Sequence, residues 1–165
     1  SSIIFYQQLG RSINIIDYHE EKGQGLPYYI KMINEKDYVY KDHFAPHDIE
    51  VTEFGNGKTR REVATQLGLR FRVVPKIPLE DGIHATTMML PRCWIDVDHC
   101  KSLIDALRHY HRKYIDKNRM FRSKPVHDWS SHACDAMRYL AVGLQEINTR
   151  QTAPQSVADN SYRII

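Results

Sequence analysis

Two aspartates, Asp48 and Asp135, lie where the expected secondary structure leaves a carboxylate available for chemistry. Asp48 follows Pro46, and a proline cannot donate to a central sheet, so Asp48 is expected at or just beyond the end of a strand. Asp135 lies off the apolar stripe of a helix expected over about 130–146. Carboxylates at such positions suit Mg²⁺ or Mn²⁺, which can hold a phosphate and activate water for in-line attack. Both residues are therefore candidate ligands of a hydrolytic metal site.

Further polar groups precede Asp135 in the sequence. At about 100° per residue, Asp128, His132 and Asp135 would share one helix face. Asp128 is thus a third candidate ligand, and His127 and His132 are candidate supporting groups. A structural role competes with this interpretation, because aspartates serve more often as turn or cap residues, and we favour capping for Asp128. The nitrogen and sulfur spacing that zinc requires is not found.

The elements that must position these residues are read from the apolar periodicity. A hairpin is expected over 3–8 and 13–18, then a helix over 26–33 and an extended run over 37–44. The first strand starts abruptly at Ser1, so we expect it to begin upstream, in a longer polypeptide of which this chain is a fragment.

The rest of the chain alternates between helices and short strands. A glycine-rich loop tip at 55–57 precedes a helix over 60–67, with Gly68 as its stop, and a strand over 71–74. A helix over 81–90, a strand over 93–95 and a long helix over 98–117 lead to the helix that holds Asp135. We therefore expect one α/β domain over 1–147, followed by a flexible tail over 148–165.

Composition narrows the class of protein. The chain has 165 residues and three cysteines, an odd number that fits free thiols in a cytoplasm better than disulfides. No apolar stretch approaches the roughly 20 residues that cross a bilayer, so we expect a soluble protein without a membrane partner. The net charge of +3 is small, but Lys58, Arg60 and Arg61 cluster beside the expected loop tip. This cluster is either a solvated surface or a contact to DNA phosphates.

Three strings, PHDIEVTEFGNGKTRRE, RFRVVPKIPLEDGIHA and HDWSSHACDAMRYLAVG, resemble in this order the C-terminal nuclease domain of tailed-bacteriophage large terminase subunits. The resemblance covers nearly the whole chain up to about Gly143. It implies a ribonuclease H-like fold, with a mixed central β-sheet flanked by helices and a first strand truncated at the N-terminus. It also implies a metal-dependent endonuclease that cuts concatemeric double-stranded viral DNA during genome packaging, with two Mg²⁺ or Mn²⁺ ions.

Matched motif by motif, the resemblance makes Asp48 the second and Asp135 the third of the family's acidic ligands. The first belongs to an Asp-x-Gly-x-x-Asp segment that runs into a serine, and this chain begins at that serine. The implied partners are DNA, an ATPase domain in the same full-length chain, the portal protein and the small terminase subunit, in the host cytoplasm. Two alternatives stay open: a resolvase or integrase of the same fold, and a non-catalytic module that docks DNA or protein.

Overall fold

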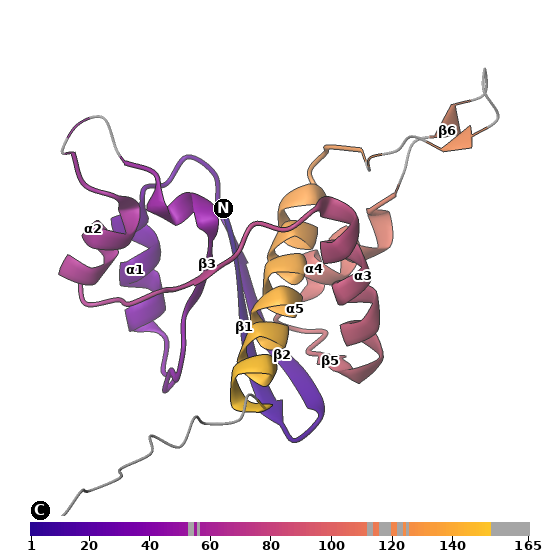
Figure 1. The fold of residues 1–165 in the computed structure, drawn as a ribbon, viewed down its shortest axis with the longest axis horizontal. Helices are drawn as coiled ribbons and strands as arrows, with labels where there is room; N and C mark the ends of the chain where they lie inside the picture. The colour runs from indigo at the N-terminus through magenta and orange to yellow at the C-terminus, as the bar shows by residue number, and fades with distance from the viewer. Residues whose placement is uncertain are drawn as a thin grey trace, which may run out of the picture.

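Helices and strands alternate along the chain and form a mixed α/β fold (Figure 1). The structure is a computed structural model that describes residues 1–52, 55, 57–111, 114–115, 120–121, 124 and 126–152. In chain order, the elements are β1 (Ser2–Leu9), β2 (Ser12–Glu20), α1 (Leu26–Glu35), β3 (Phe44–Pro46), η1 (His47–Glu50), α2 (Arg60–Gln66), β4 (Arg72–Val74), α3 (Leu79–Met89), η2 (Leu90–Arg92), β5 (Cys93–Ile95), α4 (Lys101–His109), β6 (Tyr114–Ile115), β7 (Met120–Phe121) and α5 (Ser131–Thr152). None of the described helices combines the length and the apolar composition that a bilayer crossing requires.

The larger sheet has the strand order β1-β2-β5 and is mixed. β1 and β2 form the expected antiparallel hairpin, which turns at Gly10 with a φ of 59°. β2 and β5 pair in parallel, with Ile13 opposite Cys93, which confirms the strand expected over 93–95. The larger sheet therefore contains both antiparallel and parallel pairs, which confirms the expectation of a mixed sheet flanked by helices.

The second sheet consists of the short parallel strands β3 and β4, in which Phe44 lies opposite Arg72. The extended run expected over 37–44 is wrong for residues 37–43, which form no strand. The side chains explain the difference. The ring of Tyr38 packs 5.6 Å from that of Phe5, and the Tyr40 hydroxyl donates to the carbonyl of Ile33 at 2.9 Å. The aromatic residues that favour strands are thus held by packing against the body of the protein instead of by ladder pairing.

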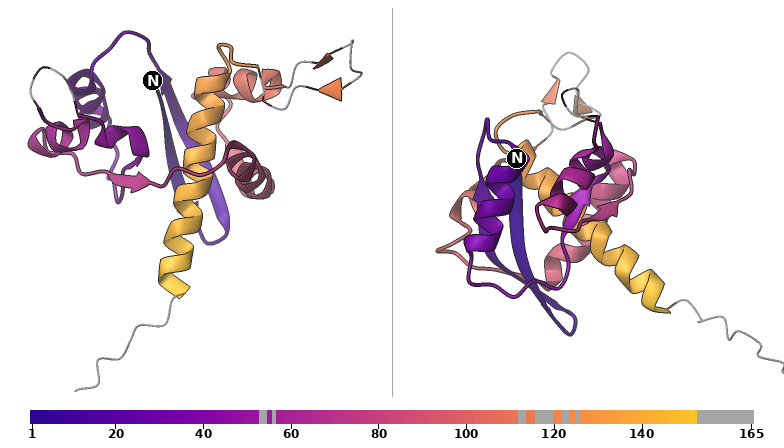
Figure 2. Two further views of the ribbon diagram at one scale, coloured as in Figure 1. Left: turned by 45° about the horizontal axis from the view of Figure 1, so that its top comes forward. Right: turned by 90° about the vertical axis from the view of Figure 1, so that its left-hand side faces the viewer.

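Helices cover both faces of the hairpin (Figure 2). On one face, Ile4 and Tyr6 pack into a core that includes Leu103 of α4 and Met137 of α5. On the other face, Phe5 packs against Ile30 and Ile33 of α1. The alternation along β1 therefore sends successive side chains into two separate cores, as the pleat of a strand requires.

Two helices differ in length from the expectation. α4 spans Lys101–His109, so the helix expected over 98–117 is wrong at 98–100 and at the described residues 110, 111, 114 and 115. The sequence supplies a reason: a longer helix would place Arg108 one turn from Arg112, and like charges at that spacing repel. α5 continues to Thr152, past its expected end near 146, and the remainder of the expected tail, 153–165, lies outside the described residues.

Candidate functional site

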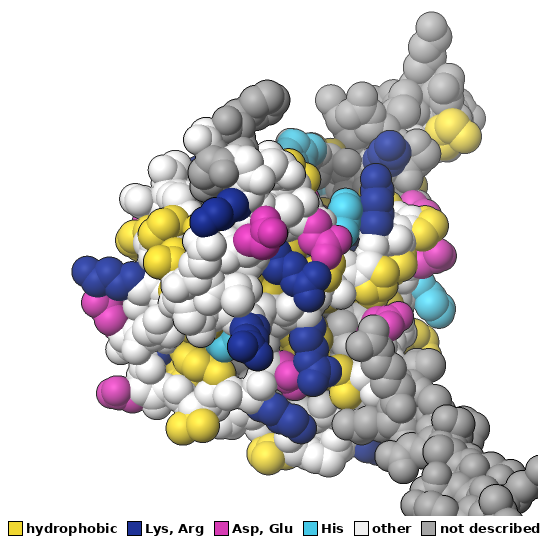
Figure 3. Space-filling model, turned by 60° about the vertical axis from the view of Figure 1, so that its left-hand side comes forward, with side chains coloured by type: hydrophobic (Ala, Val, Ile, Leu, Met, Phe, Trp, Pro, Cys, Tyr) yellow, Lys and Arg dark blue, Asp and Glu magenta, His cyan; other side chains and the backbone are white. Residues whose placement is uncertain are grey.

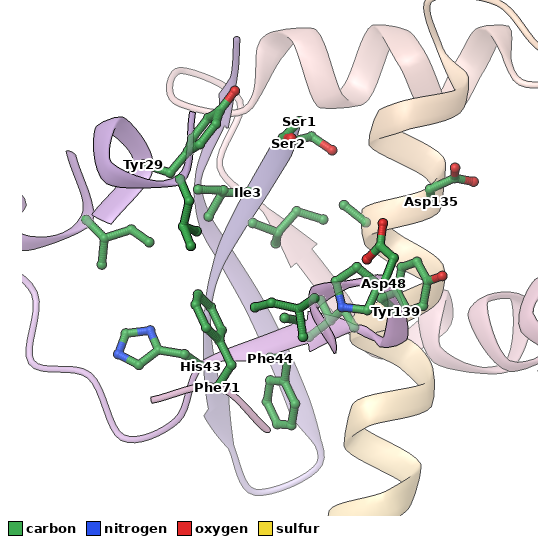
Figure 4. A pocket seen from close by; sticks show the side chains of 18 of the residues that line it. Ser1, Ser2, Ile3, Tyr29, His43, Phe44, Asp48, Phe71, Asp135 and Tyr139 are labelled. Carbon is green, nitrogen blue, oxygen red and sulfur yellow. The ribbon is translucent and has the colours of Figure 1, made fainter. Parts of the chain in front are cut away.

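A cavity of about 460 Å³ opens between β1, α1, β3 and α5 (Figure 4). Its walls are mostly apolar. Acidic and basic side chains also line it: Asp48, Asp135, Arg60, His43 and His132. The two aspartates that the sequence singled out thus border one cavity, although they belong to segments far apart in the chain.

Asp48 is exposed and lies in the short turn that follows β3. Pro46 ends the strand with extended backbone, and the backbone N–H of Val51 closes the turn by donating to the carbonyl of Asp48 at 3.1 Å. Ile49, the next residue, is buried and anchors the turn. The position at a strand end was predicted from Pro46 and is confirmed.

Asp135 lies on α5 and forms an ion pair with Arg138, one turn further along the same helix. The Arg138 side chain is 18% exposed, and its Cδ atom lies 3.4 Å from where a Cβ atom at Gly82 of α3 would stand. The Arg138 Nε atom is buried without a hydrogen-bond partner among the described residues. Asp135 therefore faces the cavity beside a cation that is fixed by packing.

Tyr139 lies within the electrostatic influence of both carboxylates. Its pKa is raised first by burial and then by the nearby charges of Asp48 and Asp135, with Arg138 acting in the opposite direction. Figure 4 shows Asp48 beside the Tyr139 ring, with Asp135 on the same helix as Tyr139. The negative charges of both carboxylates thus raise the pKa of the same hydroxyl. The sequence analysis missed Tyr139, although its position four residues after Asp135 places both on one helix face.

Of the other predicted site residues, His132 lines the cavity, whereas Asp128 and His127 do not. Helix α5 starts at Ser131, so the helix face expected to hold Asp128, His132 and Asp135 does not include Asp128. The Asp128 carboxylate instead accepts hydrogen bonds from the hydroxyl and the backbone N–H of Ser130, which lower its pKa. These bonds form a turn immediately before α5.

The two histidines lie beside this turn. His127 Nδ1 lies 3.0 Å from the Ser131 hydroxyl, and the His127 ring stands edge-on to that of His132 at 6.0 Å. Of the two, only His132 lines the cavity. His132 also accepts a 2.8 Å hydrogen bond at its backbone carbonyl from the Ser2 hydroxyl, which ties α5 to β1.

Two members of the basic cluster are bonded to neighbours, one of which is an acid. Arg61 donates to Glu50 at 2.9 Å, and Lys58 donates to Gln66 at 3.2 Å. Arg60 starts helix α2 and is the member of the cluster that lines the cavity together with the carboxylates. On the face that carries α1 and α2, Figure 3 shows basic side chains interspersed with acidic ones.

The donor atoms match a hard divalent cation in kind. Carboxylate oxygens are the ligands that Mg²⁺ and Mn²⁺ take, and Asp48 and Asp135 present them to the cavity. In number they fall short. Over the part of the chain that the structure describes, no three His, Cys, Asp or Glu side chains gather closely enough to hold a metal ion. Water or a carboxylate from elsewhere would have to complete the coordination.

A buried acid outside the cavity was also missed. Asp17 of β2 is buried and pairs with Lys36, the residue that follows α1. Asp17 also accepts from the backbone N–H of Tyr18 at 2.8 Å and lies 3.4 Å from the Tyr38 hydroxyl. A charged residue inside the apolar strand run was the signal, because such a residue is buried only when paired. The pair fastens α1 to the sheet and so fixes one wall of the cavity.

The chain is similar to one curated protein, the terminase large subunit of Escherichia phage T5. The two are 39% identical over 61 residues, which is 36% of this chain and 14% of that protein. The chain thus spans a small part of the length of its relative. No protein-family model matches the chain. No solved structure matches it either. The similarity supports a relationship to terminase large subunits.

Proposed function

We propose that this chain is the nuclease domain of a phage large terminase subunit and cuts concatemeric double-stranded DNA during genome packaging. One observation carries the proposal: Asp48 at a strand end and Asp135 on α5 border the same cavity and both act on Tyr139. A carboxylate at a strand end and one on a late helix are what the resemblance to ribonuclease H-like nucleases implies. The similarity to a terminase large subunit supports the packaging role.

Asp48 and Asp135 would hold the divalent ions, Mg²⁺ or Mn²⁺, together with water or a carboxylate from elsewhere. Bound ions of this kind orient and deprotonate water and stabilise the leaving oxygen. Tyr139 carries its proton at neutral pH, as any tyrosine does, and the rise in its pKa extends this to more alkaline pH, so its hydroxyl can donate to a phosphate oxygen. Arg60 brings a positive charge to the same cavity and can contact the DNA backbone, with Lys58 beside it.

Within the full-length protein, we propose that the domain works next to an ATPase domain and docks the portal protein and the small terminase subunit in the host cytoplasm. Asp128 and His127 are less suited to the site than Asp48 and Asp135, because they do not line the cavity. His132 does line it and is retained as a supporting group.

The test is plasmid nicking by the full-length protein with Mg²⁺ or Mn²⁺. Asp48→Asn and Asp135→Asn should each abolish nicking, because the amide loses the charge that binds the metal, while thermal unfolding shifts little. Asp105→Asn is a matched control, since Asp105 is an exposed aspartate on α4, outside the cavity. Nicking by either cavity variant at the wild-type rate would remove that residue from the site.

A non-catalytic docking module is the alternative from another class, and the Asp135–Arg138 pair favours it, because a carboxylate already paired needs no metal. Calorimetric titration with Mn²⁺ separates the two proposals. A nuclease should bind Mn²⁺ in the wild-type protein and lose that binding in Asp48→Asn. Identical heats of Mn²⁺ titration in the wild-type protein and in Asp48→Asn would favour the docking module.

A further inference from the structure

Arg138 provides Asp135 with a counter-ion from the same helix. The Arg138 Nη2 atom donates to the Asp135 Oδ1 atom, and among the described residues no other acid forms an ion pair with Arg138. The two residues are three positions apart on α5, so they are neighbours on the helix surface. One oxygen of the Asp135 carboxylate is therefore already engaged within the protein.

Packing holds Arg138 more firmly than a surface arginine. Its side chain is 18% exposed, whereas that of Arg72, which pairs with Asp42, is 52% exposed. Gly82 of α3 leaves the room that Arg138 needs, because a Cβ atom there would stand 3.4 Å from the Arg138 Cδ atom and 3.6 Å from Nη1. Arg138 therefore lies against α3, and this contact restricts the positions that its guanidinium can take.

The buried guanidinium depends on Asp135 for charge compensation. An arginine cannot give up its proton in a protein, so burial cannot make it neutral. The Arg138 Nε atom already lacks a hydrogen-bond partner among the described residues. Removing the partner of a buried ion leaves an uncompensated charge, which is unfavourable. Any second cation that binds the Asp135 carboxylate therefore draws it away from Arg138.

The positive charge of Arg138 reaches the part of the cavity that Asp48 and Asp135 border. Arg138 acts to lower the pKa of the Tyr139 hydroxyl, against burial and the two carboxylates, which raise it. A divalent cation beside Asp135 would meet the same positive field, and like charges repel more strongly where water is partly excluded. The neighbourhood of Asp135 thus both attracts and opposes a metal ion.

We propose that Arg138 competes with the divalent cation for Asp135 and so restrains the loading of the site with metal. This restraint rests on the proposed metal-dependent function and adds a means of regulating it. In the metal-free protein, the Asp135–Arg138 pair neutralises the carboxylate and keeps the guanidinium compensated. The affinity of the site for metal is then the difference between what the cation gains at Asp135 and what Arg138 loses there. Cutting is thereby held back at low concentrations of the ion.

Mn²⁺ binding, followed by electron paramagnetic resonance of the unbound ion, tests this competition. Arg138→Met removes the charge and keeps an apolar side chain against α3, so the Kd for Mn²⁺ should fall by at least about tenfold. Arg138→Lys keeps the charge and should stay within about threefold of the wild-type Kd. Arg108→Met is the matched control, because Arg108 is an exposed arginine of α4 outside the cavity, and its Kd should equal that of the wild type.

A second measurement uses the wild-type protein. The Nε–H resonance of Arg138, assigned by its loss in Arg138→Lys, should shift when Mg²⁺ is added, because the guanidinium loses its hold on Asp135. Mg²⁺ is chosen because it is diamagnetic. The Nε–H resonance of Arg72, which donates to Asp42 at 2.8 Å outside the cavity, is the control and should stay in place.

Each other outcome contradicts the competition in a recognisable way. Equal Mn²⁺ affinity in the wild type and in Arg138→Met, with binding lost in Asp48→Asn, would overturn the role of Arg138 and leave the proposed nuclease standing. Weaker binding in Arg138→Met would show that Arg138 positions Asp135 for the metal instead. An Arg138 resonance that does not move while the ion binds would likewise refute the competition. Absence of binding from every variant, Arg138→Met included, would refute the metal site itself.

Discussion

Replacing Lys36 by methionine should lower the free energy of unfolding by about 2 kcal/mol. Asp17, whose side chain is 8% exposed, would lose its cation. Breaking a buried ion pair by removing one partner costs about 3–5 kcal/mol. The loss should be smaller here because Lys36 is 33% exposed and Asp17 keeps its bonds from Tyr18 and Tyr38. The Lys36 Nζ atom lies 5.3 Å from the centroid of the Phe5 ring, so methionine also removes this cation–π contact, while its similar length limits the loss of packing.

Urea unfolding with linear extrapolation measures this change. Lys31→Met is the matched control, because Lys31 is 76% exposed and its pair with Glu35 should contribute less than about 0.5 kcal/mol. The double variant Asp17→Asn with Lys36→Met should recover part of the loss, since it leaves no buried charge unpaired. If Lys36→Met unfolds like Lys31→Met, the buried pair does not hold α1 against the sheet.

Two further predictions concern packing and ionisation. Gly143→Leu should destabilise the fold by about 1–3 kcal/mol by overpacking, because even a Cβ atom at Gly143 would stand 3.0 Å from the Phe44 ring. In Gly143→Ala, better helix propensity should offset that contact. The melting temperatures of the two variants test this difference. Burial raises the pKa of Cys100 to about 11 and that of Cys134 to about 12. The folded chain should therefore hold thiol protons that the unfolded chain loses from about pH 9. The free energy of unfolding should fall as the pH rises from about 9 toward those values. In native protein a thiol reagent should modify the half-buried Cys93 first, and equal rates at all three cysteines would contradict this burial.

The sequence predicted elements best where local signals were strong. The hairpin around Gly10, the stop at Gly68 and the strand at Cys93–Ile95 were all predicted, because turn glycines and apolar runs act within a few residues. It failed over 37–43, where aromatic residues that favour a strand pack onto Phe5. That packing depends on residues distant in sequence, and periodicity carries no record of it.

The candidate site shows the same division. A strand end could be inferred for Asp48 from Pro46, and an off-stripe position for Asp135 from helical spacing. That both aspartates border one cavity depends on how β3 packs against α5, which no local pattern encodes. Arg138 was missed for a related reason, because its role arises from a close approach to Gly82 on another helix.

The position of α5 at the end of the described chain has a consequence for folding during synthesis. α5 contacts β1, β3, β4, α3 and α4, so it joins parts of the protein that otherwise share few contacts. Until residues 131–152 leave the ribosome, the hairpin can form but most of its larger core has no partner. Unpaired strand edges and exposed apolar surface in that interval favour aggregation. Truncations that remove α5 should therefore yield insoluble chains instead of a smaller folded domain, and completion of α5 should be the step at which these residues of the nascent chain first resist proteolysis.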